Sequence, residues 1–428
     1  MGTFPQNFHY PFLWGKILNH NLDVILINAQ ITSMGEGQSW ITAGLAIVGY
    51  DLPRESVPLF FGIGVQLTGL DAIGGTPPIK KIFTPTSDFE SGEWRAHGNP
   101  ESKQTWTDHK VQVIHDYYIE SRMFDSFDFR VRFAPRVQIN STAPLPLTSW
   151  LQDWINPLRE LIDASTGRRE EITAIWVHGD LVDQNSIERR GQIFGRGISQ
   201  APYFSSQREA ASAKAAFTLR GNENSLLDLI ASWHANSGNP LLQMYSTVIV
   251  AKDQHPRSRL LFSIQCLEGL YGYENRATRN SRIRKHNVKK FDFLQHLTVD
   301  AKNGGSAITS SDRKFAKESI TNGPVSGLDF SLRQLFDQLP DSGYIRTRLE
   351  RLKIIQDKYS DPGLKNPPIA PEDAIRHIRN DLSHGNCDYP IADVSELADF
   401  LGKIVRAHLL RVLGCDRGVQ DRALKAEE

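Results

Sequence analysis

Residues 371–385 read PEDAIRHIRNDLSHG and carry the start and stop signals of one complete amphipathic helix. A proline followed by two acidic residues is typical of a helix start, and Gly385 suits the left-handed position just past a helix end. The apolar positions recur three and four residues apart: Ile375, Ile378 and Leu382. Because this spacing places them on one face, the stretch predicts a helix that packs into a helical bundle.

The polar residues of this helix gather at its C-terminal end. Asn380 and His384 are four residues apart and project from the same face, and Arg379 precedes Asn380. A histidine with an ordinary pKa of about 6.5 can both accept and donate a proton near neutral pH. An arginine can hold a phosphate and offset the charge of a phosphorane-like transition state. The combination predicts metal-independent RNA cleavage, in which His384 transfers protons and Arg379 holds the phosphate. Asn380 would orient either the histidine or the scissile phosphate.

The spacing alone does not distinguish such a site from an ordinary helix end. Histidine and arginine near a helix C-terminus interact favourably with the helix dipole without any catalytic duty. A second arginine–histidine pair with similar spacing, Arg279 and His286, lies in a basic stretch without an apolar stripe, and we interpret it as a chance match. Local sequence therefore leaves both interpretations open.

Helical periodicity dominates the C-terminal part of the chain. Apolar residues recur at helical spacing in the segments 225–236, 258–275, 331–339, 344–359, 371–385 and 394–414. No convincing strand occurs between them, so we predict an all-α bundle over residues 225–428.

The N-terminal part has the period of β-strands. Short apolar or alternating runs bounded by turn residues predict strands at 23–27, 40–50, 59–67, 127–133, 172–177 and 215–219. One helix is expected at 147–167 and a long surface loop or excursion at 74–107, while residues 180–212 resist assignment. The predicted fold class is α+β, with a β-rich domain at residues 1–224 that has a sensing or regulatory role, followed by the helical domain.

Composition narrows the setting in which the protein acts. Lys+Arg and Asp+Glu are both 49, so a polyanionic partner has to be met by a local patch. The three cysteines form no CxxC pair, and no cluster of metal ligands occurs, so we expect no disulfide framework, metal or cofactor. Residues 1–12, MGTFPQNFHYPF, lack the basic start and apolar run of a signal peptide, so we expect none, and no apolar run is long enough to span a membrane. We therefore expect a cytoplasmic protein.

Further residues near the helix end are candidates for supporting roles. The stretch 276–290 could contact RNA phosphates through Arg276, Arg279, Arg282, Arg284, Lys285, Lys289 and Lys290, or could be a solvated inter-helix loop. Glu268 lies in the middle of the helix at 258–275 and is expected to pair with an arginine such as Arg379. Asp381 could cap, pair with a basic residue or face solvent.

Several of these stretches resemble a known family. RNDLSHG (379–385) resembles the signature of HEPN domains: an arginine, a polar residue and, four to six positions after the arginine, a histidine at a helix end. RLLFSIQCLEGLYGYEN (259–275) resembles the first long helix of the HEPN domain in ApeA-like proteins, including its central glutamate. FLWGKILNHNLDVILINAQ (12–30) and LTSWLQDWINPLRELIDASTGRREEITAIWV (147–177) resemble the ApeA N-terminal domain.

The resemblance implies an anti-phage defence protein that acts by abortive infection. Its HEPN domain would be an endoribonuclease that leaves 2′,3′-cyclic phosphate ends on an RNA substrate, with tRNA or another structured RNA as candidates. HEPN nucleases form homodimers that bring two arginine–histidine motifs together, and higher oligomers remain open. Some relatives carry a modifiable tyrosine two residues after the histidine, whereas this chain has Asn386 there. The alternative is a non-catalytic module that binds RNA or a protein through the bundle and its basic segment.

Overall fold

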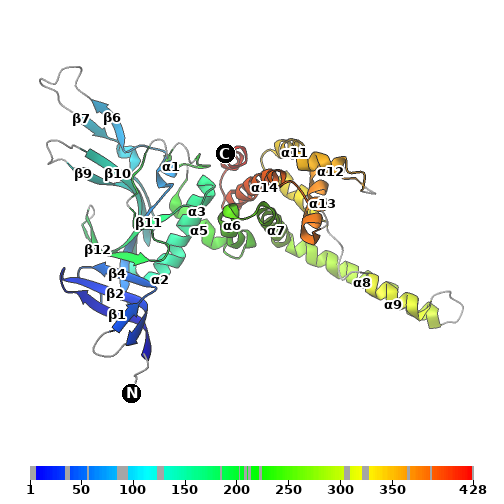
Figure 1. Ribbon diagram of the computed structural model, residues 1–428, viewed down its shortest axis with the longest axis horizontal. Coiled ribbons are helices and arrows are strands. Elements are labelled where there is room, and N and C mark those ends of the chain that lie inside the picture. Colours follow the sequence, from blue (N-terminus) through cyan, green and yellow to red (C-terminus); the bar gives the residue numbers. More distant parts are fainter. Residues whose placement is uncertain are drawn as a thin grey trace. The chain divides into compact units, whose positions relative to one another are not determined.

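The computed structural model divides the chain into two compact units, Met1–Asn236 with Leu410–Glu428, and Ser237–Leu409. The residues that it describes are 6–33, 39–54, 57–83, 95–122, 130–183, 186–201, 203–206, 210, 214–220, 224–302, 309–320, 327–363, 367–385 and 388–426. The β-rich part precedes an all-helical part, which confirms the predicted α+β class (Figure 1).

The first unit is built on a ten-stranded antiparallel sheet with the order β1-β2-β4-β12-β11-β5-β10-β9-β8 and with β3 paired to β2. The strands are β1 (Gln6–Ile17), β2 (Leu22–Ser33), β3 (Ser39–Thr42), β4 (Leu45–Gly49), β5 (Leu59–Leu67), β8 (Gln104–Thr107), β9 (Val111–Arg122), β10 (Arg130–Pro146), β11 (Ile172–Asp183) and β12 (Ser186–Gly195). In the central strand β5, Ile63, Val65 and Leu67 are fully buried. The sheet therefore has its core where β5 lies between β10 and β11.

One position in β5 has a glycine for a steric reason. Gly64 is the register partner of Trp176 in β11, and a Cβ atom on Gly64 would occupy the space of the Trp176 indole. Glycine in a strand commonly marks such a close approach. The missing side chain lets the indole lie across β5, and Trp176 is 4% exposed as a result.

Helices cover part of this sheet. The helix predicted at 147–167 is present as α2 (Leu147–Ser149), a π-helical stretch (Trp150–Ile155) and α3 (Asn156–Thr166). Trp150 is fully buried and its indole N–H donates to the carbonyl of Phe60 at 3.0 Å. The short helix α1 (Leu70–Gly74) packs against α3, as does α5 (Leu226–Ala235), which belongs to the same compact unit.

One expectation for the β-rich part was wrong, and another was incomplete. The expected surface loop or excursion at 74–107 contains β6 (Ile79–Phe83) paired with β7 (Arg95–Gly98), a 3-10 turn (Pro100–Ser102) and β8. β7 is exposed throughout and β6 nearly so, so burial imposes no apolar alternation that the sequence could show. The expected strand at 215–219 is absent, because these residues bond to the ends of α3 and α1, with Ala216 N–H donating to Ser165 at 2.7 Å and Leu219 N–H to Ile73 at 2.7 Å.

Two other assignments were incomplete. Strand β12 lies within residues 180–212, for which the sequence predicted no structure. Of the predicted strand at 127–133, residues 130–133 belong to β10, and residues 127–129 lie outside the described residues.

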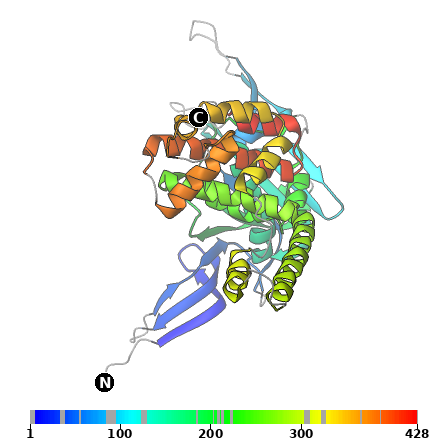
Figure 2. The same cartoon turned by 90° about the vertical axis from the view of Figure 1, so that its right-hand side faces the viewer.

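Every element after β12 in the described part of the chain is helical. The helices after α5 are α6 (Pro240–Val250), α7 (Pro256–Glu274), α8 (Arg276–Lys302), α9 (Ser310–Ser319), α10 (Leu328–Gln338), α11 (Ser342–Glu350), α12 (Lys353–Tyr359), α13 (Pro371–His384), α14 (Ile391–Val412) and α15 (Arg417–Lys425). In the second unit α13 packs against α10, α12, α11 and α7, and α6 packs along α7 (Figures 1 and 2). The described helices include none long and apolar enough to cross a membrane.

Candidate active site

The helix α13 has the boundaries and the buried face that its sequence predicts. Pro371 lies in its first turn, and Gly385 ends it with a φ of 69° and an N–H that donates to the carbonyl of Asp381. Ile375 and Ile378 are fully buried and Leu382 is 5% exposed, which confirms the apolar stripe. Because this apolar face is packed in the helical bundle, the polar C-terminal end of the helix has a fixed position.

The first turn of α13 is tied to a neighbouring helix. Glu372 is 1% exposed, and its Oε1 atom accepts a hydrogen bond from Nε of Arg346 in α11 at 2.8 Å. The same guanidinium donates to Asp337 in α10 at 2.8 Å. A buried carboxylate needs such a partner, because an uncompensated buried charge is costly.

Arg379 and Asn380 contact each other directly. The Nη1 atom of Arg379 donates to Oδ1 of Asn380 at 3.2 Å, and its Nη2 atom lies 3.6 Å from Oε2 of Glu268 in α7. The expected partner of Glu268 is thus the arginine of the motif. Both charged side chains are more than one third exposed, so this ion pair orients the guanidinium more than it stabilises the fold.

His384 is the last residue of α13 and its side chain is exposed. Within the described residues, no hydrogen bond or ion pair joins His384 to Arg379 or Asn380. Helix geometry nevertheless places Asn380 and His384 on one face, one turn apart. The imidazole is therefore open to solvent, to a substrate or to a second protein chain.

Asp381 pairs with a basic residue, which decides among its three possible roles. Nζ of Lys358 in α12 lies 2.8 Å from Oδ2 of Asp381, and the hydroxyl of Tyr389 donates to the same oxygen at 2.6 Å. Lys358 also donates to Asp361 at 3.0 Å. Burial alone would raise the pKa of Asp381, but the hydrogen bonds from Lys358 and Tyr389 outweigh it and hold this pKa below its ordinary value.

Sequence reasoning missed Lys358 and Tyr389. Both side chains fix the last turn of α13, next to the exposed histidine. Burial would lower the pKa of Lys358, but hydrogen bonds to Asp381, Tyr389 and Asp361 raise it, so the ammonium stays charged. The partners lie on different elements, and no local spacing connects Lys358 with Asp381.

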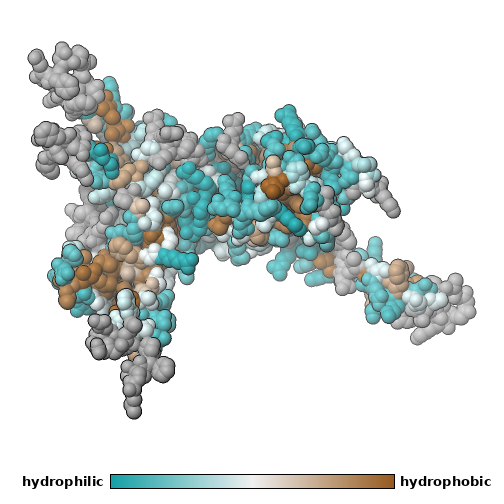
Figure 3. All heavy atoms as spheres, viewed as in Figure 1, coloured by the Kyte–Doolittle hydropathy of each residue, from teal (hydrophilic) through white to brown (hydrophobic). Residues whose placement is uncertain are grey.

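The basic stretch 276–290 is helical and forms the first half of α8, so its interpretation as a loop was wrong. Most of its cationic side chains are exposed: Arg276, Arg279, Arg282, Arg284, Lys285 and Lys289. Lys290 is half-buried, and its Nζ atom donates to the carbonyl of Ile320 at 2.6 Å. Because several of these residues are spaced three and four apart, the helix presents a cationic face to solvent. The side of the molecule in Figure 3 shows mostly hydrophilic side chains over the helical elements.

A comparison with protein families identifies the N-terminal part. The family model for ApeA N-terminal domain 1 matches residues 1–233. The chain belongs to this ApeA family. No curated protein and no solved structure matches the chain. Membership of the ApeA family supports a role in anti-phage defence, and the helical region that follows the match fits a HEPN-like domain.

Proposed function

We propose that this ApeA-family chain is a metal-independent endoribonuclease of the HEPN type, which acts in the cytoplasm in anti-phage defence by abortive infection. The observation that carries the proposal is the end of α13, where Arg379 contacts Asn380 and Glu268 one turn from the exposed His384. In this proposal residues 1–224 sense infection or restrain the enzyme, and residues 225–428 cut RNA.

The proposed reaction needs two proton transfers at one phosphate. The ribose O2′ attacks the neighbouring phosphorus while the bond from phosphorus to O5′ breaks, which leaves a 2′,3′-cyclic phosphate and a free 5′-hydroxyl. One imidazole removes the proton from O2′ and another gives a proton to O5′. Since one chain supplies a single His384, a homodimer with two facing α13 ends supplies both groups.

The neighbours of His384 would stabilise the reacting phosphate. Arg379 would donate to the non-bridging oxygens as negative charge develops on them. Glu268 would keep its guanidinium at the helix end, and Asn380 would orient either the imidazole or the phosphate. The exposed cations of α8 would hold the flanking RNA, since phosphate contacts supply most sequence-independent affinity.

The test is RNA cleavage by the full-length protein in the presence of EDTA, with analysis of the product ends. We expect 2′,3′-cyclic phosphate ends, and we expect His384→Ala and Arg379→Ala to reduce cleavage at least about hundredfold. His377→Ala is the matched control, because His377 lies on the same helix outside the proposed site. Undiminished cleavage in both site variants would overturn the proposal.

The exposed basic face of α8 favours one other function, a non-catalytic module that binds RNA or a protein partner. In that case the double variant of Arg379 and His384 keeps both its RNA affinity and its cellular phenotype. Neutralising the cations of α8 would then abolish both properties.

A further inference from the structure

Two aromatic side chains of the second unit form a pair at its surface. Tyr271 in α7 and Phe330 in α10 meet edge to face, with their ring centroids 6.3 Å apart and their planes at 87°. Tyr271 is half-buried, whereas Phe330 is 41% exposed. The more buried ring therefore fixes the position of the other, which keeps much of its surface open to solvent.

The tyrosine of this pair lies close to the motif arginine. Tyr271 follows Glu268 by one helical turn, so both project from the same side of α7. The carboxylate of Glu268 is 3.6 Å from Nη2 of Arg379. Among the described residues this guanidinium donates one hydrogen bond, to Asn380, so it retains N–H groups that can bind a phosphate.

The phenylalanine of the pair is tied to the same helix end. Asp329 precedes Phe330 in α10, and its Oδ1 atom is 3.5 Å from Nε of Arg376 in α13. Arg376 and Arg379 are three residues apart and share one side of α13. Because α10 packs against both α7 and α13, the aromatic pair lies where these three helices meet, beside Arg379.

A second guanidinium lies at the other end of the aromatic pair. Gly272 directly follows Tyr271, and Nη1 of Arg279 in α8 lies 3.7 Å from the position that a Cβ atom of Gly272 would take. Arg279 is exposed and forms no ion pair with the described residues. Along α7, Glu268 precedes Tyr271 and Gly272 follows it. Arg379 and Arg279 therefore flank the aromatic pair.

This combination has the chemistry of a nucleotide site. A single exposed apolar residue needs no explanation, since such residues are common on protein surfaces. Here the exposed ring lies between two arginines. Proteins that bind single-stranded RNA stack unpaired bases on aromatic side chains and contact the flanking phosphates with cations.

We propose that Phe330, supported by Tyr271, stacks on an unpaired base next to the phosphate that is cleaved, and that Arg279 contacts the phosphate on the far side of this base. The inference rests on the proposed nuclease function and deepens it, because it assigns a base-binding site beside Arg379. A base held in this way cannot be part of a duplex. Paired RNA would reach the cations of α8 without using the aromatic pair.

RNA binding by the full-length protein with His384→Ala, measured by fluorescence anisotropy, tests this proposal. The probes are a labelled single-stranded octaribonucleotide and the same strand annealed to its complement. We expect the additional change Phe330→Ala to weaken binding of the single strand at least about fivefold and to leave duplex affinity unchanged. Phe330→Tyr should retain the affinity, because it keeps an aromatic ring. Phe315→Ala is the control, since Phe315 is 72% exposed on α9, outside the proposed site.

The variants also exclude a purely structural effect. If Phe330→Ala fails to fold by circular dichroism, Phe330→Leu replaces it, because leucine keeps an apolar side chain without an aromatic face. Full affinity for the single strand in the folded variant, or an equal loss for single strand and duplex, would overturn the proposal.

A cleavage assay with His384 intact separates this proposal from the proposed nuclease. If the wild type cuts RNA and the folded Phe330 variant keeps full single-strand affinity, only the base-binding site is overturned. If the wild type cuts no RNA while the Phe330 variant selectively loses single-strand affinity, the nuclease is overturned and the base-binding site is supported.

Discussion

The Nζ atom of Lys358 in α12 lies 2.8 Å from Oδ2 of Asp381 in α13, and the lysine side chain is 8% exposed. The hydroxyl of Tyr389 reaches the same oxygen at 2.6 Å. Asp381 therefore joins three parts of the second unit: α12, the last turn of α13 and the residues that lead into α14.

Removing the lysine charge should loosen the end of α13. We expect Lys358→Met to lower the free energy of unfolding by about 1–3 kcal/mol, because Asp381 and Asp361 lose a hydrogen-bond donor that is charged. Denaturant unfolding followed by circular dichroism measures this change. Lys353→Met, at an exposed lysine in the same helix, should stay within about 0.5 kcal/mol of the wild type. Equal loss in both variants would contradict a special role for Lys358.

Acid should remove the contribution of Asp381 to the stability of the folded protein. Because its pKa is held below the ordinary value in the folded state, Asp381 stabilises the fold above the unfolded pKa of about 3.9. This stabilisation is lost as the pH falls through the lower folded pKa. The difference in unfolding free energy between the wild type and Asp381→Asn should therefore be largest near neutral pH and shrink below about pH 4. If the difference in unfolding free energy between the two proteins instead grew on acidification, the pKa of Asp381 would not be lowered in the folded state.

Glu268 should affect RNA cleavage more than stability. Its ion pair with Arg379 is exposed by more than one third on both sides, so Glu268→Gln should change the unfolding free energy by less than about 1 kcal/mol. If the carboxylate positions the guanidinium, cleavage should fall by about tenfold or more. Glu268→Asp should restore part of the lost rate. A stability loss without any change in rate would assign Glu268 to the fold alone.

The cations of α8 should determine the salt dependence of RNA binding. Arg276, Arg279 and Arg282 are exposed, and we expect their joint replacement by glutamine to weaken binding. The slope of log affinity against log salt should become shallower by about 0.7 for each phosphate of a single strand that the helix no longer neutralises. Fluorescence anisotropy of labelled RNA at several salt concentrations measures this slope. The control replaces other exposed cations of the second unit, Arg333, Arg351 and Lys353, and should leave the slope unchanged.

Local signals explain what the sequence predicted well. The boundaries of α13 follow from Pro371 and Gly385, and its buried face follows from the spacing of Ile375, Ile378 and Leu382. The helix at 147–167 was recognised for the same reason, since its apolar residues recur at helical spacing. Each of these features is encoded within a short stretch of neighbouring residues.

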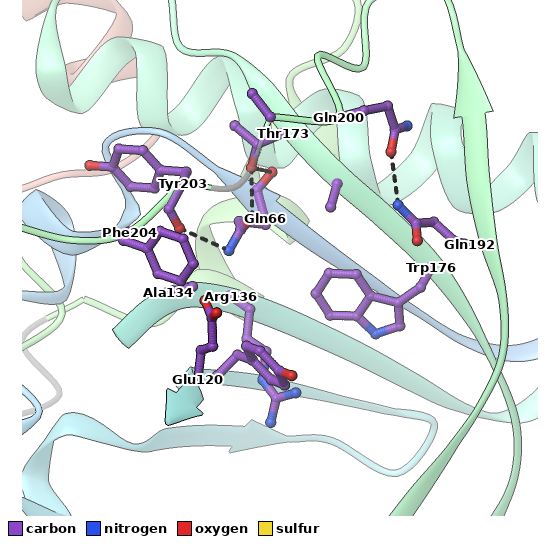
Figure 4. A pocket seen from close by; sticks show the side chains of 13 residues that line it. Gln66, Glu120, Ala134, Arg136, Thr173, Trp176, Gln192, Gln200, Tyr203 and Phe204 are labelled. Atoms are coloured by element: carbon purple, nitrogen blue, oxygen red, sulfur yellow. Dashed lines mark hydrogen bonds between the residues drawn. The ribbon is translucent and has the colours of Figure 1, made fainter. Parts of the chain in front are cut away.

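Features that depend on distant partners could not be predicted in this way. Lys358 is buried because Asp381 and Asp361 surround its ammonium, and the sequence shows only a lysine near a helix end. Phe217 is fully buried although it belongs to no strand. The apolar residues at 215–219 therefore resembled a β-strand in the sequence. A cavity of about 400 Å³ on the sheet of the first unit (Figure 4) was also not predicted, because its lining residues come from β5, β9, β10, β11, β12 and the segment that follows β12.

Gly64 restricts which amino-acid replacements are possible at residues 64 and 176. Any side chain at residue 64 would compete with the Trp176 indole for the same space, so the two positions are linked as a pair. In a saturation mutagenesis screen, residue 64 should tolerate no single replacement while residue 176 remains tryptophan. Small residues at 64 should become acceptable only together with a smaller residue at 176. Homologues should accordingly exchange these two positions in concert rather than one at a time.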